Sequence, residues 1–303
     1  MKKTLIACMA LLTLCACEKE IASDEETSKV EQVTVPTDAD GNPIKTKKFT
    51  FTLKGDFTSE WKSVTRANEY MSADGKEMTD VWVLDYMGET LIQQLHQSNT
   101  DDDFGVPVMN LAYGSHHVYI IASRSTGATL DTENHIIKFT KVLDTFYKDY
   151  AVDVVSTSNG NRAVTLNRVV TRLRLTFTDV VDAQATTINF APTTWYYGWD
   201  YIAGAPADAK TDHVVTITIP DSEKGKAGLQ ANLFGFSGAD AWTTDVAINS
   251  KKSDNTIIGQ ATLLDVPFKA NRISEMSGPL FGTEGEMTLS LNGTWDTAYE
   301  GTW

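Results

Sequence analysis

Cysteine is nearly absent from this chain. The three cysteines are Cys8, Cys15 and Cys17, and no other follows them. The rest of the sequence therefore has no disulfide, no thiolate ligand for zinc and no thiol nucleophile. A body of roughly 250 residues can bury enough apolar surface to fold without such cross-links.

Positive charge is also scarce. The chain has 26 lysines and arginines against 40 aspartates and glutamates, which gives a formal net charge of −14. Nucleic-acid binding requires cationic side chains against the phosphates, so this balance excludes nucleic acid as a partner. The same charge opposes direct binding to an acidic membrane surface.

Long apolar runs are missing except at the start. Leu5 to Leu14 is apolar and follows Lys2 and Lys3. About ten residues are too few to cross a bilayer as a helix, which needs roughly twenty, so the run is typical of a secretion signal. The chain would then have no membrane span of its own.

The end of this leader carries a lipidation motif. Leu14-Cys15-Ala16-Cys17 resembles the bacterial lipobox, in which the last cysteine receives diacylglycerol on its sulfur. We expect cleavage between Ala16 and Cys17, a lipid on Cys17, and attachment to a membrane through that lipid. The alternative is an ordinary Cys17 behind a simple secretory leader or a buried N-terminal helix.

Helical periodicity is absent from the body of the chain. Residues 17–47 are polar and acidic and predict a flexible tether, although Glu31 to Pro36 alternates and could form a short strand. From residue 48 onward, apolar and polar side chains alternate with the period of two that is typical of strands. We expect strands over 49–53, 81–86, 90–95, 118–122, 169–177, 213–219 and 287–291, with a hairpin turn at Gly88.

The number of strands predicts an all-β protein with two tandem β-sandwich domains. About 250 ordered residues exceed the roughly 100 of one sandwich. We place the boundary near residue 158, in the polar run Ser156 to Asn161. The predicted organisation is a signal peptide (1–16), an acidic tether (17–47), an N-terminal sandwich (48–158) and a C-terminal sandwich (159–303).

No catalytic or metal-binding pattern is present in the sequence. The histidines lack zinc spacing, and no nucleophile elbow or phosphate loop occurs. His116 and His117 would point to opposite faces of a strand near Gly114. The acidic runs 38–42 and 101–103 fit solvated turns better than calcium sites. We therefore predict a protein that is not an enzyme and that has no metal or cofactor.

An aromatic cluster offers two interpretations. Trp195, Tyr196, Trp199 and Tyr201 could stack on sugar rings or on a partner protein. Alternatively, Trp195, Tyr197 and Trp199 share one face of a strand and fill the core, with Tyr196 on the other face.

Several segments together resemble one protein family. The lipobox, the two all-β halves, and the stretches Asp80–Tyr86, Leu166–Leu173 and Trp195–Gly198 resemble the fimbrillin-A-associated anchor family. Its members are lipoprotein subunits of the type V pili of anaerobic Gram-negative bacteria. The resemblance implies transthyretin-like sandwiches, an outer-membrane location at the cell surface, and other fimbrial subunits as partners. It implies an anchor, accessory or tip role in which subunits are joined by strand exchange.

Details of that assembly stay open at the level of sequence. Related pilins are cut by an arginine-specific protease, but the tether has no arginine, and Arg66 and Arg124 are the main candidates before the first domain ends. Met287 to Leu291 could be donated to a neighbour or could close the second sandwich. A glycan-binding surface lipoprotein is the second hypothesis, and a hydrolase is the third.

Overall fold

The computed structural model describes residues 30–55 and 78–282 and the backbone of 299–302. The described chain is built from β-strands, as predicted, and its one helical element is the short 3-10 turn η1 (Asp221–Glu223). No helix in these ranges has the length and apolarity needed to span a bilayer. The leader with Ala16 and Cys17, Arg66, and the expected strand 287–291 lie outside the described residues.

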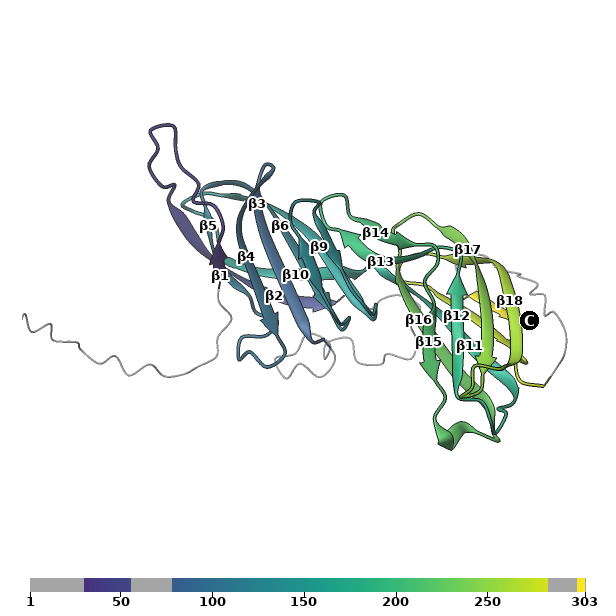
Figure 1. Ribbon diagram of the computed structural model, residues 1–303. Helices are drawn as coiled ribbons and strands as arrows, with labels where there is room; N and C mark the ends of the chain where they lie inside the picture. Colours follow the sequence, from purple (N-terminus) through teal and green to yellow (C-terminus); the bar gives the residue numbers. More distant parts are fainter. Residues whose placement is uncertain (1–29, 56–77, 283–298, 303) are drawn as a thin grey trace, which may run out of the picture.

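An eight-stranded sheet forms the first half of the molecule (Figure 1). Its strands in spatial order are β1 (Val30–Gln32), β4 (Thr90–Ser98), β3 (Asp80–Met87), β6 (Gly114–Ser123), β9 (Thr145–Val154), β10 (Asn161–Arg168), β2 (Thr46–Gly55) and β5 (Val108–Ala112). The hairpin predicted at Gly88 joins β3 and β4, and Gly88 has a φ of 59°, which L side chains rarely adopt.

Both faces of this sheet are covered, which is why its central strands are almost continuously apolar. On one face Val83 and Ile120 belong to the same buried cluster as Phe49 and Phe51, which lie on β2 near the far end of this sheet. On the other face Tyr86 and its neighbours join the core that continues into the second half of the chain. The prediction of a central strand covered on both faces at 118–122 is therefore confirmed.

Part of the segment predicted as a tether joins the sheet, in keeping with the alternative that Glu31 to Pro36 forms a short strand. Val30 to Gln32 form β1, which pairs with β4 although all three side chains are exposed. The amides of Val33 and Thr34 also donate to the carbonyl of Ile92. Main-chain hydrogen bonds alone can extend a sheet edge, so a polar sequence does not exclude a strand here.

The other described strands form three four-stranded sheets, two from the second half alone and one that also takes β7 and β8 from the first half. Two of them form a sandwich (Figure 1). One sheet has the order β16 (Ala227–Phe236), β11 (Val170–Val180), β19 (Ile273–Gly278) and β20 (Tyr299–Thr302), and the other has β15 (Val215–Thr218), β12 (Thr187–Pro192), β17 (Trp242–Lys251) and β18 (Ile257–Phe268). The third combines distant segments: β14 (Ala205–Lys210), β13 (Trp195–Asp200), β8 (Ile136–Lys138) and β7 (Thr129–Asp131).

The chain changes sheets at Val169. The boundary predicted near residue 158 falls between β9 and β10, which are neighbours in the eight-stranded sheet. β10 also pairs in parallel with β2, so that sheet extends to Arg168. After Val169, β11 pairs with β16 and β19 instead. We therefore propose Val169, rather than residue 158, as the division between the two halves.

Candidate functional site

Two edge strands, β15 and β16, lie on the same side of the second sandwich. Among the described residues, β15 pairs with β12 alone and β16 pairs with β11 alone. In Figure 1 the two strands lie side by side on the flank that faces the eight-stranded sheet. One side of each strand thus has backbone groups that no strand of the described residues covers.

A groove runs between these two edges. One pocket, of about 630 Å³, is lined by Thr140–Leu143, Tyr197, His213–Thr218 and Gln230–Phe234. A second, of about 440 Å³, is lined by residues of the same two strands, by the connection between them and by Ile188 of β12. Ile217, Thr218, Gln230 and Ala231 line both, so the two pockets form one continuous groove, which we call the β15–β16 groove.

The floor of the groove is apolar because both strands alternate. In β15, Val215 and Ile217 are half-buried while the intervening threonines are exposed. In β16, Leu229 is half-buried and Ala231 is buried, with Gln230 exposed between them. Side chains of alternate strand residues point to opposite faces, so each strand presents its apolar set to the space between the sheets.

The two ends of the groove differ in their polar groups. At one end, Tyr197 is only 5% exposed and its hydroxyl has no hydrogen-bond partner among the described residues. Burial raises the pKa of Tyr197 to about 12, so the hydroxyl keeps its proton at neutral pH. His213 stands edge-on to the Tyr197 ring, with 4.7 Å between the ring centroids, and the exposed Lys141 lines the same pocket. At the other end, Glu223 lines the wall.

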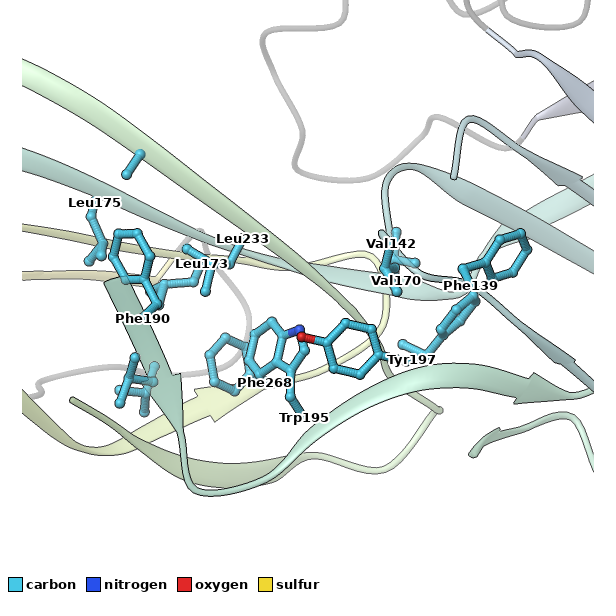
Figure 2. Packing of buried hydrophobic residues seen from close by; sticks show 14 of the residues in the cluster. Phe139, Val142, Val170, Leu173, Leu175, Phe190, Trp195, Tyr197, Leu233 and Phe268 are labelled. Atoms are coloured by element: carbon cyan, nitrogen blue, oxygen red, sulfur yellow. The ribbon is translucent and has the colours of Figure 1, made fainter. Parts of the chain in front are cut away.

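The predicted aromatic contact residues are mostly in the core. Trp195, Trp199 and Tyr201 are 2% exposed or less. Trp195 packs edge-on against Phe268 at 5.1 Å, and Figure 2 shows the two side by side with Tyr197. Of the two interpretations, core packing holds for Trp195 and Trp199, which strand alternation turns inward. Stacking on a ligand is ruled out for these two and for Tyr201, whose hydroxyl bonds that of Tyr86.

Tyr196 is the one member of the predicted contact set that is not fully buried. It is half-buried and stands edge-on to Trp242, with 5.2 Å between the ring centroids. A single half-buried ring offers a sugar little stacking area.

The two neighbouring histidines point to opposite faces of β6, as the sequence predicts. His116 is buried, with Nδ1 2.6 Å from Oδ1 of Asp85 and Nε2 2.8 Å from the carbonyl oxygen of Ala112. His117 is exposed and pairs with Asp149. Both ring nitrogens of His116 face oxygen acceptors, and the doubly protonated ring is the form that donates to both.

The acidic runs form turns. Asp38 Oδ1 accepts hydrogen bonds from the amides of Asp40 and Asn42, and Asp101 Oδ2 accepts one from Ser98. Within residues 30–55 and 78–282, no group of three or more potential ligands gathers in metal-binding geometry.

Sequence reasoning missed the β15–β16 groove. The alternation of 213–219 identified a strand, and it indicated which residues face inward. Whether a strand has one neighbour or two depends on pairing with distant segments, and the local pattern carries no signal for that.

No protein-family model matches the chain, and no curated protein matches its sequence. Solved structures do show similarity. A candidate adhesin from Bacteroides ovatus has 11% identity and a TM-score of 0.48, over 77% of this chain and 87% of its own. A candidate polysaccharide-binding protein from Bacteroides thetaiotaomicron has 10% identity and a TM-score of 0.48, over 72% and 80%.

A fimbrial anchor protein, Mfa2 from Porphyromonas gingivalis, is also among the similar structures. It has 6% identity and a TM-score of 0.42, over 71% of this chain and 81% of its own. The structural neighbours of this chain thus include a fimbrial anchor protein and candidate adhesins.

Proposed function

We propose that this chain is a structural subunit of a cell-surface fimbria that joins a neighbouring subunit by accepting an extended strand in the β15–β16 groove. The supporting observation is the open edge itself: an apolar groove flanked by β15 and β16, each paired on one side only among the described residues. An added strand would bond to the backbone of an edge and place alternate side chains in the groove.

The geometry favours a strand over a small molecule. The groove follows two strands and joins two pockets end to end, whereas a small-ligand site is a compact cavity with converging polar groups. Val215 and Ile217 are spaced two residues apart, which is the spacing of side chains on one face of a bound strand. The partner is therefore a segment with apolar side chains at every second position.

The lipid on Cys17 is the second part of the proposal. It would hold the subunit, and the pilus with it, at the outer membrane, since the sequence offers no other membrane attachment. In this role the chain is either the anchor subunit that ends the polymer or an accessory subunit within it.

The groove can be tested with a charge placed on its floor. In Ile217→Lys, an incoming apolar side chain would meet an ammonium group, so we expect the variant to be lost from purified pili. Ile257→Lys is the matched control, because Ile257 is 50% exposed on β18, the edge strand at the opposite end of the same sheet. Equal recovery of both variants in pili would rule out the groove as the joint.

The anchor role can be tested separately at the lipidation site. In Cys17→Ala, we expect folded subunit and intact pili in the culture medium instead of on the cells. Pili that stay attached to the cells of this variant would contradict the anchor role, whatever the outcome at Ile217.

A further inference from the structure

The β15–β16 groove is chemically asymmetric along its length. Among the described residues, the wall around Tyr197 contains Lys141 and His213 and no carboxylate, although the chain as a whole has a net charge of −14. The wall of the other pocket contains Glu223 as its charged residue. A strand bound in the groove would therefore meet donors and positive charge at one end and negative charge at the other.

The donor at the first end is fixed in place. Tyr197 belongs to β13, is 5% exposed, and is flanked by the ring of His213. Its hydroxyl has no partner among the described residues, and a buried hydroxyl without a partner costs free energy. The hydroxyl oxygen has almost no accessible surface, so neighbouring side chains must move before an acceptor from a ligand can reach it, and the hydrogen bond formed would then remove that cost.

Building on the proposed function, we infer that the Tyr197 end of the groove recognises a carboxylate carried by the incoming strand of another subunit. The Tyr197 hydroxyl donates to it, and Lys141 supplies a positive charge at the rim. Apolar side chains then occupy the floor between Ile217 and Leu229. At the far end, Glu223 rejects a second acid and accepts a basic residue.

This arrangement fixes which end of the groove takes the acid of the bound strand. A parallel and an antiparallel strand both satisfy it, with opposite orders of residues. The stretch from His213 to Ile219, which contains the four residues of β15, is seven residues long and spans ~20 Å at roughly 3.3 Å per residue. A partner segment of similar length would have its acid at one end and its basic residue at the other. The reverse placement would bring carboxylate against Glu223 and ammonium against Lys141, which costs binding free energy.

The inference can be tested with capped peptides on the folded chain. Two heptapeptides, Lys-Val-Thr-Val-Thr-Val-Glu and Glu-Val-Thr-Val-Thr-Val-Lys, cover both strand directions, and each is compared with its Glu-to-Gln form by fluorescence anisotropy. A third peptide ends in valine with a free α-carboxylate. It tests whether a main-chain carboxylate binds in place of the side-chain carboxylate of Glu. We expect the peptide with one strand direction and one carboxylate source to have the lowest Kd. Its Gln form should have a Kd about tenfold higher.

Tyr197→Phe keeps the ring and removes only the hydroxyl, so it is the sharpest variant. It should weaken the Glu peptide about tenfold and abolish the difference between the Glu and Gln forms. Lys141→Gln is a second variant, at an exposed position where the change does not disturb the core. It should weaken the binding of the same peptide.

The outcomes separate this inference from the proposed function. If Ile217→Lys abolishes peptide binding while Tyr197→Phe and Lys141→Gln leave the Glu preference unchanged, the groove stands and carboxylate recognition is overturned. If no peptide binds, the inference is overturned, and the recovery of Ile217→Lys in pili decides the proposed function on its own.

Discussion

The indole of Trp195 lies directly against the backbone of Gly235. A Cβ built on Gly235 would be 2.7 Å from Cε2 of Trp195, closer than real side chains come. The indole Nε1 donates a hydrogen bond of 2.9 Å to the carbonyl of the adjacent Phe234. These contacts fix β13 across β16, and β13 carries Tyr197 at the end of the groove.

Gly235→Ala should therefore destabilise the fold. The added methyl group forces the indole or the strand to move, and overpacking of this kind costs about 1–3 kcal/mol. Denaturant unfolding measures the loss, with the exposed Asn232→Ala on the same strand as a control expected within ~0.5 kcal/mol. Trp195→Phe in the Gly235→Ala background should recover part of the loss, and strict additivity of the two changes would contradict the contact.

The His116–Asp85 pair predicts how stability depends on pH. Burial alone lowers the pKa of His116, but the hydrogen bond and charge of Asp85 and the carbonyl of Ala112 outweigh it, so the pKa is raised above 6.5. The folded state therefore binds a proton that the unfolded state releases at lower pH. Its stabilising effect is complete below about pH 6.5 and is lost as pH rises through the raised value.

We expect the free energy of unfolding to fall as pH increases above 6.5, and to fall less steeply in His116→Gln. Chemical denaturation across that range measures the slope. His117→Gln is the matched control, since His117 is half-exposed and faces Asp149 at the surface, where pairs contribute little. The same slope in wild type and His116→Gln would show that the buried pair does not titrate as described.

The sequence predicts much of the local structure but little of its long-range arrangement. Alternation located Phe49, Phe51 and Leu53 in a buried strand face, and Gly88 in its turn. The strand predicted over 169–177 corresponds to β11, but Arg168 ends β10 and only Val169 separates the two strands. Nothing near Val169 in the sequence marks the change of sheet, because it depends on pairing with β2 and β16.

Sequence reasoning had the same limit at the candidate site. The Trp195 cluster was visible as a run of aromatics, and its burial followed from alternation only for residues within β13. The third sheet pairs β13 with β8, about sixty residues earlier in the chain, and no periodicity reports such a contact. The open edges of β15 and β16 are likewise a property of the whole pairing pattern.

Arg168 and Asp144 form a buried, bidentate ion pair next to Val169, where the chain passes from the eight-stranded sheet to the sandwich. Arg168 Nε and Nη2 donate to the two carboxylate oxygens at 2.7 and 3.1 Å, and Nη1 donates to Asn271 at 2.9 Å. The guanidinium also lies 4.7 Å from the ring centre of Phe146. Asn271 precedes β19, so the arginine ties the first sheet to the second sandwich.

Asp144→Ala should cost about 3–5 kcal/mol, because it leaves the guanidinium buried without its counter-charge. The double variant Asp144→Ala with Arg168→Met should be more stable than Asp144→Ala alone, since no charge is then stranded. Urea unfolding of both, beside Asp131→Asn at the more exposed Lys138 pair, tests this. A double variant less stable than the single one would show that the pair is not the dominant interaction.

Asp179 binds three consecutive backbone amides of the segment that follows β19. Its carboxylate accepts hydrogen bonds from the amides of Leu280, Phe281 and Gly282, at 2.5–3.0 Å. Three consecutive amides aimed at one anion form a concave site that favours negative charge. Leu280 and Phe281 are thereby held with their side chains in the sandwich core.

Asp179→Ala should lower the free energy of unfolding by about 1–3 kcal/mol, because partly buried amides lose a charged acceptor. Asp179→Asn should cost less, since the amide oxygen still accepts. Hydrogen exchange gives the sharper measurement: the amides of 280–282 should exchange faster in Asp179→Ala, while those of β17 stay protected. Asp182→Ala removes a carboxylate that accepts the Gln184 amide in a nearby turn, and it should leave 280–282 unchanged. Uniform acceleration across the sandwich would mean that Asp179 acts on global stability and not on this segment.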